Sequence, residues 1–155
     1  MEIRLKNEKD LNFLRVSGKI LADTLKGLKN ATRAGVKLNE LDDLARALIH
    51  EAGGKPAFLG YRPEGARKAY PAAICASLNE TVVHGLPNDY ALKPGDILKI
   101  DLGVNYKSYI TDAAVTIGIG EISENVRKLI AVTEKALEIA IKECKAGNHL
   151  SDYLW

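Results

Sequence analysis

The sequence has no uninterrupted apolar run approaching the roughly 20 residues that a membrane-spanning helix requires. Residues 1–6 are charged and contain no signal-peptide core, so we expect a cytoplasmic protein without a membrane partner. The sequence also lacks a large excess of either charge. Its formal net charge is +2, and its lysine and arginine residues are scattered without a basic stripe. Nucleic acid is therefore not an expected partner.

Cysteine is equally scarce. Cys75 and Cys144 are too few for a disulfide framework and lack metal-ligand spacing, so we expect two reduced thiols. What is present is ordinary for a globular protein: 155 residues, 46% hydrophobic and 27% charged. No repeat, low-complexity tract or linker divides this length, which is about one domain's worth of chain.

Helical periodicity predicts two helices in the first third of the chain. The first begins at Asn7, which can form a capping box with Asp10, and carries a leucine stripe toward the core. The second begins at Asn39, with Asp42 at the third position as its capping partner, and stops at Gly53-Gly54.

A third helix is predicted to begin at Ser123 and to close at Gly147. Residues 148–155 look like the start of another element. We expect the helix to bury the apolar stripe formed by Val126, Leu129, Ile130, Thr133, Leu137, Ala140, Ile141 and Cys144.

Residues 97–116 carry the strongest local pattern, in which two β-branched apolar runs flank a polar turn and predict a hairpin. With Tyr106-Lys107 as the loop, Asp101 would lie directly opposite Asp112, with Cβ atoms roughly 4.5–5.5 Å apart. Two bare carboxylates at that separation repel, so this register predicts a divalent cation between them. Another loop would shift the pairing, and two solvent-facing aspartates would explain the same residues.

Residues 57–71 are rich in glycine and proline and carry the aromatic residues Phe58, Tyr61 and Tyr70. Such a loop either contributes to a binding site or tucks its aromatic rings onto the core. A strand is then predicted over residues 72–83, interrupted near residues 77–80.

His84 follows this strand directly and precedes a glycine. A histidine held there suits proton transfer or contact with a substrate. A structural histidine with satisfied hydrogen bonds is the alternative.

Three blocks of the sequence resemble the type I methionine aminopeptidase family. They are residues 77–87 (SLNETVVHGLP), residues 92–103 (LKPGDILKIDLG) and Asp112. The resemblance extends over nearly all of the chain. It implies an α+β protein with the N-terminal half of the pita-bread fold, an antiparallel sheet backed by helices. Residues 1–155 would then form a single partial catalytic domain.

The resemblance further implies removal of the N-terminal methionine from nascent polypeptides, with the ribosome left open as a partner. The family holds two divalent metal ions (cobalt, manganese, iron or zinc) with ligands in the order Asp, Asp, His, Glu, Glu. Asp101 and Asp112 match the first two. His84 matches the catalytic histidine that contacts the substrate near the scissile amide.

The methionine pocket of the family matches Phe58, Tyr61, Tyr70 and Cys75, and an apolar slot of this kind suits a thioether. Residues 62–68 depart from the family as a short insertion in this region. The later ligands have no counterpart in the sequence, so we expect weak metal binding and little hydrolysis by the chain alone. An uncovered sheet edge and uncovered helix faces would favour self-association.

Three other interpretations stay open at this point. The chain could be a metal-free pita-bread binding module, a half-domain that needs a separate second half, or a related proline-specific aminopeptidase. The intact Asp101, Asp112 and His84 argue against the first. The His-Gly-Leu-Pro block at residues 84–87 favours the methionine enzyme over the last.

Overall fold

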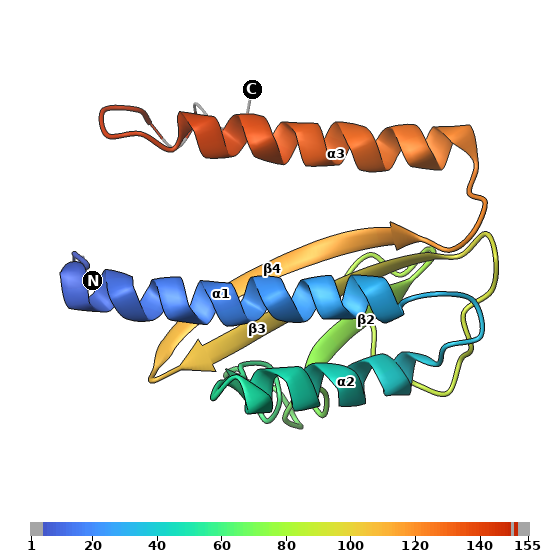
Figure 1. The fold of residues 1–155 in the computed structure, drawn as a ribbon, viewed down its shortest axis with the longest axis horizontal. Coiled ribbons are helices and arrows are strands. Elements are labelled where there is room, and N and C mark those ends of the chain that lie inside the picture. The colour runs from blue at the N-terminus through green and yellow to red at the C-terminus, as the bar shows by residue number, and fades with distance from the viewer. Residues whose placement is uncertain (1–4, 150, 152–155) are drawn as a thin grey trace. The chain divides into compact units, whose positions relative to one another are not determined.

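The computed structural model describes residues 5–149 and 151, arranged in two compact units that meet in sequence between Glu121 and Ile122 (Figure 1). The elements are α1 (Glu8–Ala31), α2 (Leu38–Glu51), β1 (Lys55–Pro56), β2 (Ile74–Leu78), β3 (Ile97–Tyr106), β4 (Tyr109–Gly118) and α3 (Glu124–Glu143). In the part of the chain that is described, no helix combines the length and apolar character needed to cross a membrane.

The predicted capping box starts α1. The Asn7 side chain accepts a hydrogen bond from the Asp10 N–H, and the Asp10 carboxylate accepts one from the Asn7 N–H, both at 3.0 Å. These bonds satisfy two N–H groups that a helix start otherwise leaves unpaired.

The start predicted for α2 is wrong. The helix begins at Leu38, and the Lys37 N–H before it donates to the carboxylate of Glu40 at 2.9 Å. Glu40 stands three residues after this cap and therefore takes the role that the sequence analysis gave to Asp42. Asp42 is buried and makes tertiary contacts described below.

β3 is the central strand of a four-stranded antiparallel sheet. β1 and β2 pair along one of its edges and β4 along the other. Side chains of a strand alternate between faces. On one face, Leu98, Ile100, Leu102 and Val104 are fully buried and join apolar residues of α1 and α2 in one core cluster. The other face of β3, which carries Asp101, is not covered by these helices (Figure 1).

β2 is shorter than the predicted strand over residues 72–83 and ends at Leu78. Asn79 adopts a left-handed conformation (φ 47°), exchanges two hydrogen bonds with the backbone of Ile97, and donates from Nδ2 to the carboxylate of Asp96 at 3.0 Å. These bonds turn the chain out of the sheet, so Val82 and Val83 are exposed despite their β-branched side chains.

The hairpin forms as predicted, but its loop is Lys107-Ser108 rather than Tyr106-Lys107. Both loop residues have positive φ, 51° and 70°, as a two-residue hairpin turn of the I′ type requires. Tyr106 pairs with Tyr109 instead, and both rings contact Phe13 of α1. Packing of the two tyrosines on α1 explains why the loop lies one residue further along the chain.

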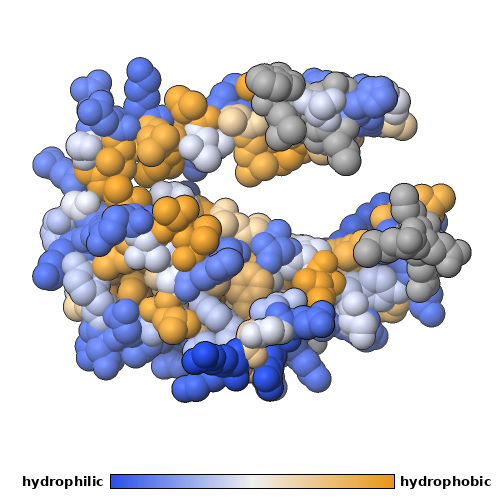
Figure 2. All heavy atoms as spheres, turned by 180° about the vertical axis from the view of Figure 1, so that it is seen from behind, coloured by the Kyte–Doolittle hydropathy of each residue, from blue (hydrophilic) through white to orange (hydrophobic). Residues whose placement is uncertain are grey.

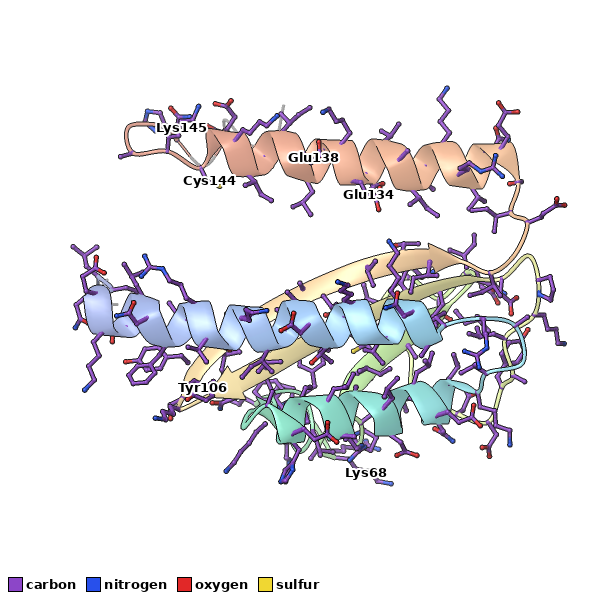
Figure 3. All side chains as sticks on the ribbon, in the orientation of Figure 1. Lys68, Tyr106, Glu134, Glu138, Cys144 and Lys145 are labelled. Atoms are coloured by element: carbon purple, nitrogen blue, oxygen red, sulfur yellow. The ribbon has the colours of Figure 1, made fainter. Side chains whose placement is uncertain are left out.

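The second unit contains α3, which begins at the predicted cap Ser123. The predicted buried stripe is wrong for the described residues, because no α3 side chain is buried and Leu129 and Ile141 are 66% and 62% exposed. Figure 2 shows hydrophobic side chains, in orange, on the surface of this helix. Cys144 is likewise exposed at the end of the helix that carries Glu134 and Glu138 (Figure 3). An apolar stripe is buried only where another surface covers it, and the described residues of this unit supply none. The element predicted at residues 148–155 lies largely outside the described residues.

Candidate metal and substrate site

Two carboxylates share the face of the sheet that α1 and α2 leave open. The corrected register places Asp101 opposite Ala114 and Asp112 opposite Gly103. The predicted direct pairing of the two aspartates is therefore wrong, but moving the loop by one residue keeps both on the same face. They are diagonal neighbours, roughly 7–8 Å apart along the sheet, a separation that carboxylate side chains can bridge through a bound cation.

Gly103 makes room for the second carboxylate. A Cβ atom at this position would lie 3.3 Å from Oδ2 of Asp112, 3.1 Å from Cε1 of Phe58 and 3.0 Å from the Cβ of Ala57. A side chain here would thus compete for the space that the carboxylate and the aromatic ring occupy. The residues opposite the two aspartates, Ala114 and Gly103, are both small and leave space for the carboxylates.

Asp101 forms no ion pair within hydrogen-bond distance of any cation in the described residues. Its Oδ1 atom is buried and has no hydrogen-bond partner in the described part of the chain. Burial raises the pKa of Asp101, the nearby charge of Asp112 raises it further, and His84 acts in the opposite direction. Burial also raises the pKa of Asp112. An orphaned carboxylate oxygen beside a second carboxylate is a donor set that fits a hard divalent cation.

Asp101 also lines a cavity of about 520 Å³, a volume suited to a small ligand or one end of a peptide. All predicted site residues except Asp112 line this cavity. They are Phe58, Tyr61, Tyr70, Cys75, His84 and Asp101.

Among residues 5–149 and 151, no group of three or more His, Cys, Asp or Glu side chains is placed to hold a metal ion.

Tyr70 and Cys75 form one wall of this cavity. The Tyr70 hydroxyl lies within hydrogen-bond distance of the carbonyl oxygens of Ile74 (3.1 Å) and Gly85 (3.2 Å), and Cys75 pairs with Asp101 across β2 and β3. Burial raises the pKa of Tyr70 and the pKa of Cys75 above their ordinary values. Both groups are therefore uncharged at neutral pH, and the wall stays free of charge.

His84 is positioned by the glycine that follows it. The Gly85 N–H donates to Ser77 Oγ at 3.0 Å, and the Gly85 carbonyl accepts from the Ala76 N–H at 2.8 Å. A Cβ atom on Gly85 would clash with the Ala76 carbonyl oxygen. This close approach to β2 holds His84 at the cavity in a left-handed conformation, φ 58°, which histidine adopts more readily than most residues.

Asp42 and Arg46 of α2 form a clamp that the sequence analysis missed. Asp42 Oδ1 accepts from the N–H groups of Ala73 (2.7 Å) and Ile74 (3.0 Å), while Oδ2 pairs with Arg46 at 2.7 Å. Arg46 also donates to the carbonyl of Pro71 at 3.0 Å. The clamp fixes the segment that joins Tyr70 to Cys75. An aspartate four residues before an arginine was visible in the sequence, but its partner segment was not.

Comparison with known proteins relates this chain to metal-dependent peptidases. Residues 12–153 match the model of metallopeptidase family M24. A methionine aminopeptidase of Clostridium perfringens is 41% identical over 150 residues, covering 97% of this chain and 58% of that protein. One from Helicobacter pylori is 39% identical over 152 residues, with 98% and 58% coverage. The chain thus spans about 58% of the length of these curated relatives.

Solved structures agree with this match. The crystal structure of methionine aminopeptidase from Thermotoga maritima superposes with a TM-score of 0.91 at 36% identity, covering 98% of this chain and 59% of that one. An X-Pro aminopeptidase from the same organism, at 22% identity and a TM-score of 0.73, shares the fold. The predicted α+β half of the pita-bread fold is confirmed.

Proposed function

The chain belongs to metallopeptidase family M24, and from this premise we propose that it forms part of a methionine aminopeptidase site. In this proposal Asp101 and Asp112 are ligands of two divalent ions, and His84 contacts the substrate at the first peptide bond. The methionine side chain lies against the four other predicted site residues of the cavity: Phe58, Tyr61, Tyr70 and Cys75.

One observation carries the proposal: the lining of an apolar, aromatic cavity includes a carboxylate, Asp101, whose buried oxygen has no partner in the described residues. An unbranched thioether suits such an aromatic slot. A substrate whose side chain fills the slot brings its free amine and first amide to the carboxylate end. This arrangement favours cleavage at the end of a peptide.

Divalent ions bound there would act as Lewis acids and activate a water molecule for attack on the first amide. The two carboxylates offset the charge of these ions and orient them. His84 donates a hydrogen bond near the scissile amide and stabilises charge that develops there. Tyr70 and Cys75 keep the side-chain slot uncharged, which favours methionine over polar residues.

We further propose nascent polypeptides as substrates and the cytoplasm as the location, with cobalt, manganese, iron or zinc as the metal. Two carboxylates are only part of the ligand set that the family resemblance implies. We therefore expect the chain by itself to bind metal weakly and to hydrolyse peptides slowly.

A metal titration tests the ligand assignment. The midpoint of thermal unfolding is measured with increasing Mn²⁺ or Co²⁺ for the wild type, for the double variant Asp101→Asn/Asp112→Asn, and for the control Asp89→Asn on an exposed loop. A ligand that binds only the folded state raises this midpoint. We expect the rise in the wild type and the control and its loss in the double variant.

An equal rise in the double variant would contradict the ligand assignment, and no rise in the wild type would favour the metal-free binding module. A parallel assay on a Met-Ala-Ser peptide with Mn²⁺ measures turnover. Turnover approaching that of a full-length relative would contradict the expected low activity of the chain alone. Faster cleavage of a peptide with proline in second place would favour the proline-specific alternative.

A further inference from the structure

Residues 62–69 form a loop with its own internal structure at the rim of the cavity. The Tyr70 N–H donates to the Tyr61 carbonyl, and the Gly60 N–H donates to the Tyr70 carbonyl, both at 2.8 Å, which closes the base of the loop. Within it, the Ala66 N–H donates to the Pro63 carbonyl at 3.0 Å, in a turn whose third residue, Gly65, has φ 81°. The loop is therefore shaped by its own hydrogen bonds rather than by the core.

Lys68 is the cation that this loop contributes to the cavity. The rim is otherwise lined by small or apolar residues of the loop, among them Pro63, Ala66 and Ala69. Lys68 is exposed and makes no ion pair or hydrogen bond with any residue that the structure describes. By contrast, Arg62 is engaged within the loop, since its Nε donates to the Ala66 carbonyl at 3.0 Å.

The cavity thus has two differently charged parts. Asp101, whose carboxylate would bind metal, supplies its acidic part, and Lys68 supplies a positive charge from the loop. A peptide whose first amide lies at Asp101 and whose methionine fills the aromatic slot must leave the cavity past its rim. If that path runs along the loop, a carboxylate on the departing part of the peptide can pair with Lys68, the lysine among the residues that line the cavity.

We propose that Lys68 is a specificity-determining residue that favours peptides with an acidic side chain shortly after the first residue. The inference rests on the proposed function, because it assumes that a methionine-starting peptide occupies the cavity. An ion pair at an exposed site is worth about 0.2–1 kcal/mol, so the preference should be about 1.4- to five-fold.

The test measures peptide binding rather than turnover. The chain with Zn²⁺, which is diamagnetic, is titrated with the amidated peptides Met-Ala-Asp and Met-Ala-Asn, which differ in one charge, and dissociation constants are obtained from ¹H–¹⁵N NMR shifts. We expect the wild type to bind the Asp peptide about 1.4- to five-fold more tightly at low ionic strength. The difference should shrink at high salt, because exposed charges are screened.

Two variants assign the effect to one side chain. Lys68→Gln should bind both peptides equally, whereas Arg67→Gln, the same change of charge at a neighbour that does not line the cavity, should retain most of the preference. Equal binding of both peptides by the wild type, or an equal loss in both variants, would overturn the role of Lys68 alone. Failure of every methionine peptide to bind would overturn the proposed function as well.

Discussion

The two faces of the central strand β3 differ sharply although their residues alternate along one stretch of chain. On the helix-covered face, Leu98, Ile100, Leu102 and Val104 have no exposed surface. On the open face, Asp101 lies beside Gly103, with a buried carboxylate oxygen that lacks a partner in the described residues. Alternation of side chains lets one strand serve a core and a site at once.

The energetics of the two faces are opposed. Each fully buried leucine or isoleucine contributes about 1.5–3 kcal/mol to folding. A buried polar atom without a partner costs about 1–3 kcal/mol. The covered face therefore provides the stability with which the open face holds two carboxylates close together. Variants that exchange these properties test the comparison directly.

The largest effect is expected from Leu102→Ala, which leaves a cavity in the covered face. The free energy of unfolding should fall by about 2–5 kcal/mol, measured by urea denaturation. The matched variant Ala114→Ser, on the open face of β4, should change it by less than about 0.5 kcal/mol. Similar losses at both positions would contradict the division of roles.

A smaller effect is expected from Asp96→Ala, which removes a buried carboxylate at the residue that precedes β3. The buried Asp96 carboxylate accepts hydrogen bonds from Asn79 Nδ2, the Tyr90 hydroxyl and the Lys93 N–H at 2.8–3.1 Å. Loss of these charge-assisted bonds should lower the free energy of unfolding by about 2–3 kcal/mol at pH 7.

The same variant should change the acid stability of the protein. Burial alone would raise the pKa of Asp96, but the three hydrogen bonds outweigh it and hold the pKa below the ordinary 3.8. A lowered folded-state pKa stabilises the protein above the unfolded value, and this contribution is lost as the pH falls through the folded value. The stability difference between wild type and Asp96→Ala should therefore shrink below about pH 4. A constant difference down to pH 2 would contradict this account.

The smallest effect, and one of opposite sign, is expected from Asp101→Asn in metal-free protein. The change removes an uncompensated charge from the open face with little change in shape, so the free energy of unfolding at pH 7 should rise by about 1 kcal/mol. Asp89→Asn serves as the control and should leave stability nearly unchanged. A loss of stability in Asp101→Asn would show that the carboxylate has a stabilising partner after all.

Several features of the fold followed from local sequence. The Asn7 capping box, the Ser123 cap and the hairpin depend on neighbouring residues, and all three are present. The motif around residues 77–103 also indicated the family before any contact was known. The roles assigned to Asp101, Asp112 and His84 remain proposals, although the structure places these residues at one site.

Other features depended on partners distant in sequence. Asp42 was predicted to cap its own helix, whereas it binds the N–H groups of Ala73 and Ile74. The strand predicted to reach Val83 ends at Leu78, because Asn79 pairs with Ile97 and Asp96. Local propensity carries no information about such pairings.

The sequence by itself determined that residues 97–116 form a hairpin, and with any two-residue loop the period of two puts Asp101 and Asp112 on one face. Only the tertiary structure decided which residues they oppose. Tyr106 and Tyr109 pair where both can pack on Phe13, and this contact sets the loop at Lys107-Ser108. The carboxylates consequently face Ala114 and Gly103, because a contact with α1 outweighed the turn preferences of the loop residues.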